Sequence, residues 1–143
     1  MILIDANILV YAFIPSSPQH ARAKAWLEAR LNAETAVGLP WPSLLAFVRL
    51  VSNPRVFEHP ATVAEAWQRV EEWLDRPCAW IPLPTERHRE ILGRLLKSHA
   101  SQSNLVPDAD LAALALEHGL TLCSTDGDFA RFKGVTWENP IAS

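Results

Sequence analysis

The sequence predicts an α/β fold in which a central parallel sheet is flanked by helices on both faces, and two patterns carry this prediction. The first is the opening, M-I-L-I-D-A-N, where apolar and branched residues run directly into Asp5. An unbroken apolar run is typical of a parallel strand that is buried on both faces. The second is the alternation of such short runs with helix-length segments, which favours βαβ units.

In the first part of the chain, residues 8–14 continue the apolar run without alternation, so we expect a helical turn beneath the sheet. Ser17 is the expected N-cap of a second helix, with Pro18 at its first position and an end near Asn32. A short strand is predicted at residues 36–39. The spacing assigns the inner face of the second helix to Ala21, Ala25, Trp26 and Ala29.

Two further helices follow. Ser43 is the expected N-cap of the third, and Asn53-Pro54 should end it, because the residue before a proline disfavours helical geometry. Thr62 and Glu65 have the spacing of a capping box, which opens the fourth. The expected inner faces are Leu44, Phe47, Val48 and Val51 in the third helix, and Val63, Trp67, Val70, Trp73 and Leu74 in the fourth.

The second part begins with a strand at residues 79–83 and a helix from Thr85, its N-cap, to about Lys97, with Ile91, Leu92, Leu95 and Leu96 inward. Pro107-Asp108 starts a helix that runs to His118 and ends at Gly119, the usual C-terminal glycine. Strand 120–123, loop 124–128, one helical turn at 129–132 and an edge strand at 135–138 complete the chain.

Composition sets limits on function. With 143 residues the chain is long enough for one domain with its own core, and its net charge of −3 means that any nucleic-acid site is a local patch. Cys78 and Cys123 lack metal-ligand spacing and are expected as reduced thiols in a cytoplasmic protein. We expect no signal peptide, because no basic leader precedes Asp5, and no apolar run reaches the ~20 residues of a membrane-spanning helix.

The chemistry-bearing residues are carboxylates. Asp5 and Asp126 each follow an apolar strand, so both should lie at the same rim of the sheet, where ligands bind in open α/β folds. Asp108 lies at a helix start, and Asp110 is two residues after it. Asp128 is two residues after Asp126. Each could instead be only an N-cap, a turn former or, for Asp110, a solvated residue.

Together these carboxylates indicate a cation site. Converging carboxylates raise one another's pKa unless a cation compensates. All-oxygen ligands without paired His or Cys indicate Mg²⁺, or Mn²⁺, rather than zinc. That layout is typical of metal-assisted phosphodiester hydrolysis.

Four segments resemble the PIN domain family, specifically the VapC-type toxin ribonucleases of bacterial type II toxin–antitoxin systems: I-D-A-N-I-L-V (4–10), F-V-R-L-V-S-N-P (47–54), V-P-D-A-D-L-A-A-L-A (106–115) and G-L-T-L-C-S-T-D-G-D-F (119–129). The resemblance implies a single PIN-like domain over residues 1–143, magnesium-dependent hydrolysis of RNA and a cognate antitoxin. It also implies that Asp5 and Asp108 are the principal metal ligands, that Asp126 completes the acidic pocket with Asp128 beside it, and that Asn7 and Ser124 support the ligands.

One position departs from the family pattern. Members usually carry an acidic residue on the third helix, but residues 42–50 contain no Asp or Glu, and Leu44 or Ala46 takes the place. Either the remaining carboxylates suffice, or catalysis is weak or lost and the chain acts as a binding module. A phosphatase with an aspartate nucleophile is a weaker alternative, because Asp5-Ala6-Asn7 lacks the second carboxylate of a D-x-D pair.

Two kinds of surface remain for partners. Arg49, Arg55, Arg131 and Lys133 are candidates to bind RNA near the metal, by contacts to backbone phosphate. Apolar surface on the helices could serve a homodimer or an amphipathic helix of a partner.

Overall fold

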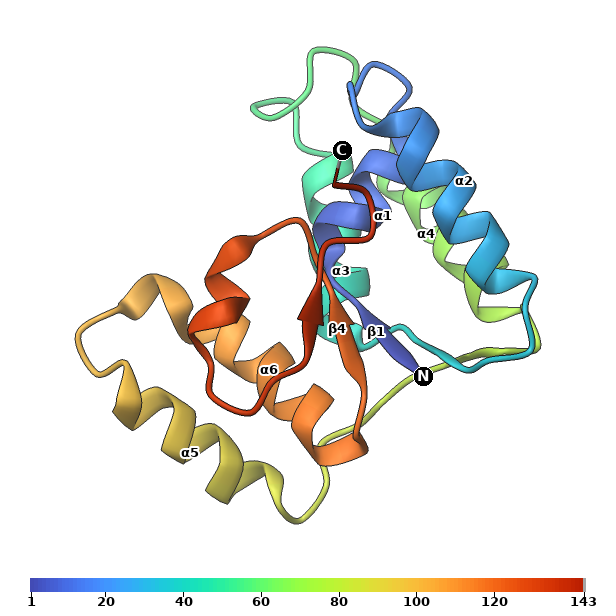
Figure 1. Cartoon of the computed structure of the whole chain (residues 1–143). Helices are drawn as coiled ribbons and strands as arrows, with labels where there is room; N and C mark the ends of the chain where they lie inside the picture. Colours follow the sequence, from blue (N-terminus) through green and yellow to red (C-terminus); the bar gives the residue numbers. More distant parts are fainter. Residues whose placement is uncertain (143) are drawn as a thin grey trace.

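Five parallel strands form the centre of the structure, a computed structural model that describes residues 1–142 (Figure 1). Their order is β3-β2-β1-β4-β5, so the first strand lies in the middle. The strands are β1 (Ile2–Ile4), β2 (Val37–Gly38), β3 (Ala79–Trp80), β4 (Thr121–Cys123) and β5 (Trp137–Glu138). Because all are parallel, their carboxyl ends share one rim, as predicted. β3 is shorter than the predicted strand 79–83, since Pro82 and Pro84 cannot donate to a ladder.

Helices cover both faces of this sheet, which confirms the predicted architecture. One face carries α1 (Ala6–Phe13), α2 (His20–Leu31), α3 (Trp41–Val51) and α4 (Val63–Leu74), and Ile2 and Ile4 point into that layer. The other carries α5 (His88–Ser98) and α6 (Val106–His118), with Leu3 pointing toward them. Figure 1 shows α5 and α6 on one side of β1 and β4 and the first four helices on the other. Two 3₁₀ turns, η1 (Ser103–Leu105) and η2 (Gly127–Arg131), flank α6 and β4. No helix within residues 1–142 is long and apolar enough to cross a membrane.

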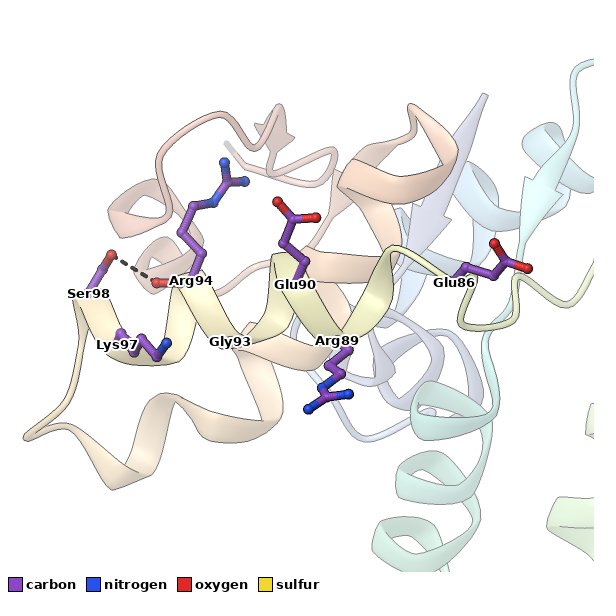
Figure 2. Close-up of a pocket in the computed structure, with 7 residues that line it drawn as sticks. All are labelled: Glu86, Arg89, Glu90, Gly93, Arg94, Lys97 and Ser98. Atoms are coloured by element: carbon purple, nitrogen blue, oxygen red, sulfur yellow. Dashed lines mark hydrogen bonds between the residues drawn. The ribbon is translucent and has the colours of Figure 1, made fainter.

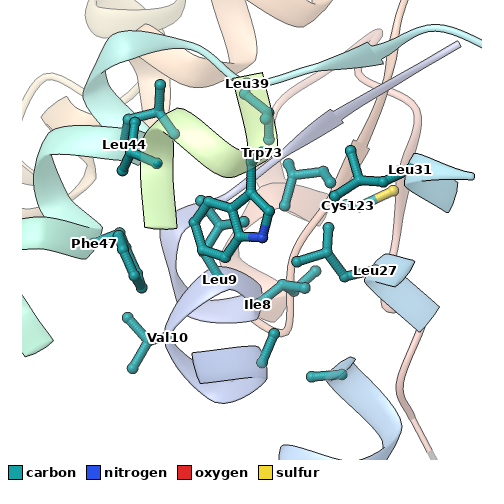
Figure 3. Packing of buried hydrophobic residues seen from close by; sticks show 14 of the residues in the cluster. Ile8, Leu9, Val10, Leu27, Leu31, Leu39, Leu44, Phe47, Trp73 and Cys123 are labelled. Atoms are coloured by element: carbon teal, nitrogen blue, oxygen red, sulfur yellow. The ribbon is translucent and has the colours of Figure 1, made fainter. Parts of the chain in front are cut away.

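The larger apolar cluster is organised around Phe47 of α3, which is fully buried. Its ring meets Phe13 edge-on at a centroid distance of 5.3 Å and lies 4.8 Å from Trp73. Figure 3 shows Leu44 among the buried residues of the same cluster. This packing ties α1, α3 and α4 into one layer.

Helix ends that depend on local chemistry are confirmed. The Thr62 hydroxyl accepts from the Glu65 amide at 3.0 Å while the Glu65 carboxylate accepts from the Thr62 amide at 3.2 Å, the reciprocal pattern of a capping box. Gly119 ends α6 with φ of 65°, a left-handed conformation that glycine adopts without steric cost.

Three predicted N-caps are wrong. Ser17 bonds to the amide and side chain of Gln19, and α2 begins at His20. α3 begins at Trp41 with Pro42 in its first turn, where a missing N–H costs nothing, so Ser43 lies inside the helix and is buried. The Thr85 hydroxyl instead donates to Glu117 of α6, and α5 begins at His88.

Two predicted helix faces also need correction. In α2 the buried residues are Ala23, Leu27 and Leu31, whereas Ala21, Ala25 and Ala29 are exposed, because burying leucine removes far more apolar surface from water than burying alanine. In α4, Ala66, Val70 and Trp73 are buried, but Val63 is 61% and Trp67 40% exposed.

Candidate functional site

The carboxyl end of β1 joins the carboxyl end of β4 at the middle of the sheet. The Asp5 amide donates to the Cys123 carbonyl at 3.0 Å, which continues the pairing of the two strands to the rim. Asp5 is also the N-cap of α1, and its Oδ1 accepts from the Ala6 amide at 2.7 Å. Asp5 therefore both caps α1 and lies at the rim of the sheet.

Ser124, which is fully buried, connects the two strand ends. Its hydroxyl donates to Asp5 Oδ2 at 2.7 Å and accepts from the Asn7 side-chain amide at 3.1 Å and the Asp126 backbone amide at 3.0 Å. The side-chain oxygen Oδ1 of Asn7 in turn accepts from the Thr125 backbone amide at 3.4 Å. This network fixes Asp5 relative to the loop that carries Asp126.

Three other carboxylates converge beside Asp5. Asp108, Asp126 and Asp128 each offer an oxygen such that these atoms lie within 4.8 Å of one another. Asp108 belongs to the first turn of α6, whose dipole favours negative charge, and Asp126 caps η2 by accepting from the Asp128 amide at 2.9 Å. Asp5 lies outside this group of three, and its two oxygens accept hydrogen bonds from Ala6 and Ser124.

The pKa values reflect this crowding. Burial, together with the charges of Asp126, Asp5 and Asp128, raises the pKa of Asp108 to about 6. Burial likewise raises the pKa of Asp5, with a smaller contribution from Asp126, although hydrogen bonds from Ser124 and Ala6 oppose it. One cationic side chain pairs with the group within residues 1–142: Arg131 Nε lies 3.4 Å from Asp128 Oδ1. That pair leaves the repulsion among Asp5, Asp108 and Asp126 uncompensated.

The donor set fits a hard divalent cation. All ligand atoms on offer are carboxylate oxygens, the type that Mg²⁺ and Mn²⁺ prefer. The third helix adds no carboxylate, since α3 has no acidic residue. Leu44 is fully buried in the apolar cluster, whereas Ala46 is half-buried, so Ala46 is the more accessible of the two positions.

Asp110 lies apart from these carboxylates. Its Oδ1 is 2.9 Å from His88 Nε2, and the other ring nitrogen of His88 contacts Glu117. Glu117 also accepts from the hydroxyl and amide of Thr85. The arrangement clips the start of α5 onto α6. Neither His88 nor Glu117 was singled out from sequence, because each is a common surface residue until the two helices are placed together.

We expect this clip to stabilise the fold in a pH-dependent way. Partial burial lowers the pKa of His88, but hydrogen bonds and charge from Glu117 and then Asp110 outweigh it and raise the pKa. Burial raises the pKa of Glu117, but bonds from His88 and Thr85 outweigh it and lower the pKa below 4.5.

The His88 contribution is therefore complete below pH ~6.5 and is lost as pH rises through the raised pKa, while that of Glu117 is lost only as pH falls through its lowered pKa. Replacing His88 by Gln should lower the free energy of unfolding by on the order of 1–2 kcal/mol at pH 6. The variant should also lack the decrease in stability that the wild type shows above pH ~6.5. Denaturant unfolding of the wild type and His88→Gln at several pH values measures both effects. If stability depends on pH in the same way in the two proteins, His88 is not the source of the pH dependence.

The four candidate RNA-binding residues divide into two locations. Arg49 lies in the last turn of α3 and Arg55 in the turn after it, both exposed. Arg131 is the last residue of η2 and Lys133 follows it, and both line one cavity together with Arg94 and His99. Sequence reasoning missed Arg94 and His99, which reach this cavity only because α5 packs against α6 and η2 lies beside them.

Comparison with known proteins gives consistent matches. The PIN domain family model matches residues 2–135. Ribonuclease VapC37 of Mycobacterium tuberculosis (strain ATCC 25618 / H37Rv) is 43% identical over 142 residues, which cover 99% of each chain. Ribonuclease VapC33 of the same strain is 38% identical over 141 residues, again 99% of each.

Among solved structures, the fold is similar to that of VapBC2 from Rickettsia felis bound to a DNA fragment from its promoter. The TM-score is 0.68 at 19% identity, covering 97% of this chain and 98% of that one. This likeness supports the architecture described above.

Proposed function

The chain belongs to the PIN domain family, and from this premise we propose that it is a metal-dependent endoribonuclease toxin that a cognate antitoxin neutralises. The observation that carries the proposal is the convergence of Asp108, Asp126 and Asp128 beside Asp5 at the rim of the sheet. Relatives named ribonucleases that match 99% of the chain support the same activity. We treat residues 1–143 as one functional domain.

We assign the metal to Asp5, Asp108 and Asp126, with Asp5 bound directly or through one water because it lies outside the group of three, and expect Mg²⁺, with Mn²⁺ as a substitute. Asp128 completes the acidic pocket. Bound there, the metal would supply an activated water and charge stabilisation at the phosphate of the scissile bond. The protein's contribution is to fix the carboxylates: Ser124 positions Asp5 and Asp126 through one hydroxyl, and Asn7 holds Ser124.

The direct test is cleavage of a labelled single-stranded RNA by the purified chain, with and without Mg²⁺. We expect cleavage that requires the metal, stops on chelation and is lost in Asp126→Asn. Cleavage that persists in Asp126→Asn would come from a contaminating nuclease or another site and would contradict the proposal.

A catalytically silent domain that acts only as a binding module is the second candidate. The absence of an acidic residue on α3 favours it, because one side of the pocket then contributes no charge. RNA binding without cleavage at any tested Mg²⁺ or Mn²⁺ concentration would establish this alternative.

If the chain is active, the missing acid should make it demand more metal. Fewer carboxylates attract a second cation less strongly, although phosphate oxygens of the substrate can complete its coordination. We expect Ala46→Glu to lower the Mg²⁺ concentration at half-maximal cleavage several-fold. Leu44→Glu should instead destabilise the protein, because it buries a charge in the apolar cluster. Saturation of the wild type at low metal, with no change in Ala46→Glu, would mean that the pocket lacks no ligand.

We further propose that the antitoxin suppresses cleavage by covering the acidic pocket. A basic side chain of the partner could pair with these carboxylates through charge-assisted hydrogen bonds and compete with the metal. The purified complex should therefore cleave labelled RNA at least about 100-fold more slowly than the free chain, and excess Mg²⁺ should restore part of the rate. Equal rates for complex and free chain would contradict this mode of inhibition.

We also propose a homodimer in the cytoplasm. Trp41 of α3 stacks on Trp67 of α4 at a centroid distance of 6.2 Å, and exposed Leu45 and Val63 lie one helical turn from them on the same faces. Exposed apolar patches of this kind mark protein interfaces. Sedimentation of the wild type and Leu45→Arg tests the dimer: the variant should be monomeric, and equal masses would place any interface elsewhere.

A further inference from the structure

A cavity of about 560 Å³ lies between α5, the end of α6 and the segment that follows η2. Arg94, His99, Arg131 and Lys133 line it, with Leu95 and Leu116 as apolar lining and no acidic side chain. This is a local concentration of positive charge on a protein whose net charge is −3. Its volume is within the usual range of small-ligand sites.

The charges that line the cavity are available to a ligand. Within residues 1–142, Arg94 and Lys133 form no ion pair, and Arg131 pairs only with Asp128, at 3.4 Å. His99 is held in place, with Nδ1 3.0 Å from Gln102 Oε1 and its ring edge-on to Phe132 at a centroid distance of 5.1 Å. An anion in the cavity could thus bind Arg94 and Lys133 without breaking an ion pair of the protein. Only at Arg131 would it compete with a carboxylate, that of Asp128.

The ion pair between Arg131 and Asp128 joins this cavity to the acidic site, because Asp128 belongs to the group with Asp108 and Asp126. A ligand that spans both places must present one anionic group to a metal site and another to a basic pocket. A nucleic-acid strand does so through successive phosphates.

We propose that the cavity binds a backbone phosphate of the RNA next to the cleaved bond, with Arg94 and Lys133 as its principal contacts. The inference rests on the proposed function for its ligand. The cavity is a second RNA-binding site in addition to the proposed active site. It also sets the direction of the strand, which runs from the acidic pocket across Arg131 toward α5.

A neighbouring hollow on the outer side of α5 provides control residues for the basic cavity. It has a volume of about 750 Å³ and is larger, and Arg94 borders it as well as the basic cavity. Glu86 and Glu90 line it together with Arg89 and Lys97, which do not line the basic cavity, so its charge is mixed. Figure 2 shows Arg94 extending from α5 on the side opposite to Arg89. Replacing Arg89 and Lys97 therefore removes two positive charges from the same helix region and leaves the lining of the basic cavity unchanged. This makes the pair a matched control for Arg94 and Lys133.

The test uses the full chain with Asp108→Asn, which keeps the RNA intact, and a fluorescent single-stranded RNA whose binding is followed by anisotropy at several salt concentrations. We expect Arg94→Gln combined with Lys133→Gln to raise the Kd at least about tenfold at low salt. The slope of log K against log salt should become shallower by about 0.7, because the two side chains neutralise one phosphate and each neutralised phosphate on a single strand contributes about 0.7. Arg89→Gln combined with Lys97→Gln should leave both nearly unchanged. Circular dichroism confirms that both pairs of variants are folded.

Equal losses in the two double variants would show nonspecific electrostatics and overturn the inference, as would no loss in either. Tighter binding of a polyglutamate peptide than of RNA, with the same dependence on Arg94 and Lys133, would overturn it in favour of an acidic polypeptide. The readout is binding, so it is separate from catalysis. Full cleavage by Asp108→Asn would refute the proposed active site, and binding measured in a chelator, on RNA shown to remain intact, would then still test the cavity.

Discussion

Replacing Asp108 by Asn is expected to slow RNA cleavage at least about 100-fold, whereas Asp110→Asn should leave cleavage within a few-fold of wild type. The two residues are two positions apart on α6, but Asp108 lies with Asp126 and Asp128 while Asp110 contacts His88. Loss of even a group that supports a metal ligand typically costs 10–100-fold, so loss of a direct ligand should cost more.

Cleavage rates at saturating Mg²⁺ measure this difference, and thermal unfolding serves as the control. Asp108→Asn should be at least as stable as wild type without metal, because it removes a carboxylate that its neighbours repel. Asp110→Asn should be slightly less stable. Similar losses of activity in both variants would mean that the two carboxylates act together or that helix stability governs the rate.

Truncating Phe47 to Ala is expected to lower the free energy of unfolding by about 3–5 kcal/mol, a large share of the ~5–15 kcal/mol that holds a domain folded. Phe47 is fully buried between Phe13 and Trp73, so truncation leaves a cavity where α1, α3 and α4 meet. Denaturant unfolding measures the cost. Phe57→Ala is the control, because Phe57 is only partly buried and should cost less.

The consequence extends to the candidate site, since α1 begins immediately after Asp5 and packs against α3. Phe47→Ala should therefore lose activity at a lower temperature than wild type. A cost below about 1 kcal/mol would contradict the description of Phe47 as the centre of this cluster.

Features governed by local chemistry could be predicted from the sequence. The strand that delivers Asp5, the capping box at Thr62 and Glu65, and the helix end at Gly119 each depend on neighbouring residues alone. The shared rim of Asp5 and Asp126 could also be predicted, because in a parallel sheet the residues that follow the strands within a few positions lie at the same rim.

Features governed by contacts between distant segments could not. Thr85 has the composition of an N-cap, yet its hydroxyl donates to Glu117, which only the packing of α5 on α6 brings within reach. The inner face of α2 depended on the larger apolar area of Leu27 and Leu31 rather than on the spacing of alanines. Ser124 was expected to support the site, but its part in fixing both Asp5 and Asp126 depends on the pairing of β1 with β4.

Anomalous scattering of Mn²⁺ in crystals of the wild-type chain, at a Mn²⁺ concentration that supports RNA cleavage, tests whether the rim carboxylates hold the catalytic metal. We expect a peak at a direct-ligand distance of about 2.1 Å from carboxylate oxygens of Asp108 and Asp126, with Asp5 bound directly or through one water. If no peak lies within roughly twice that distance of these carboxylates under conditions in which RNA is cleaved, the carboxylates at the rim do not hold the catalytic metal.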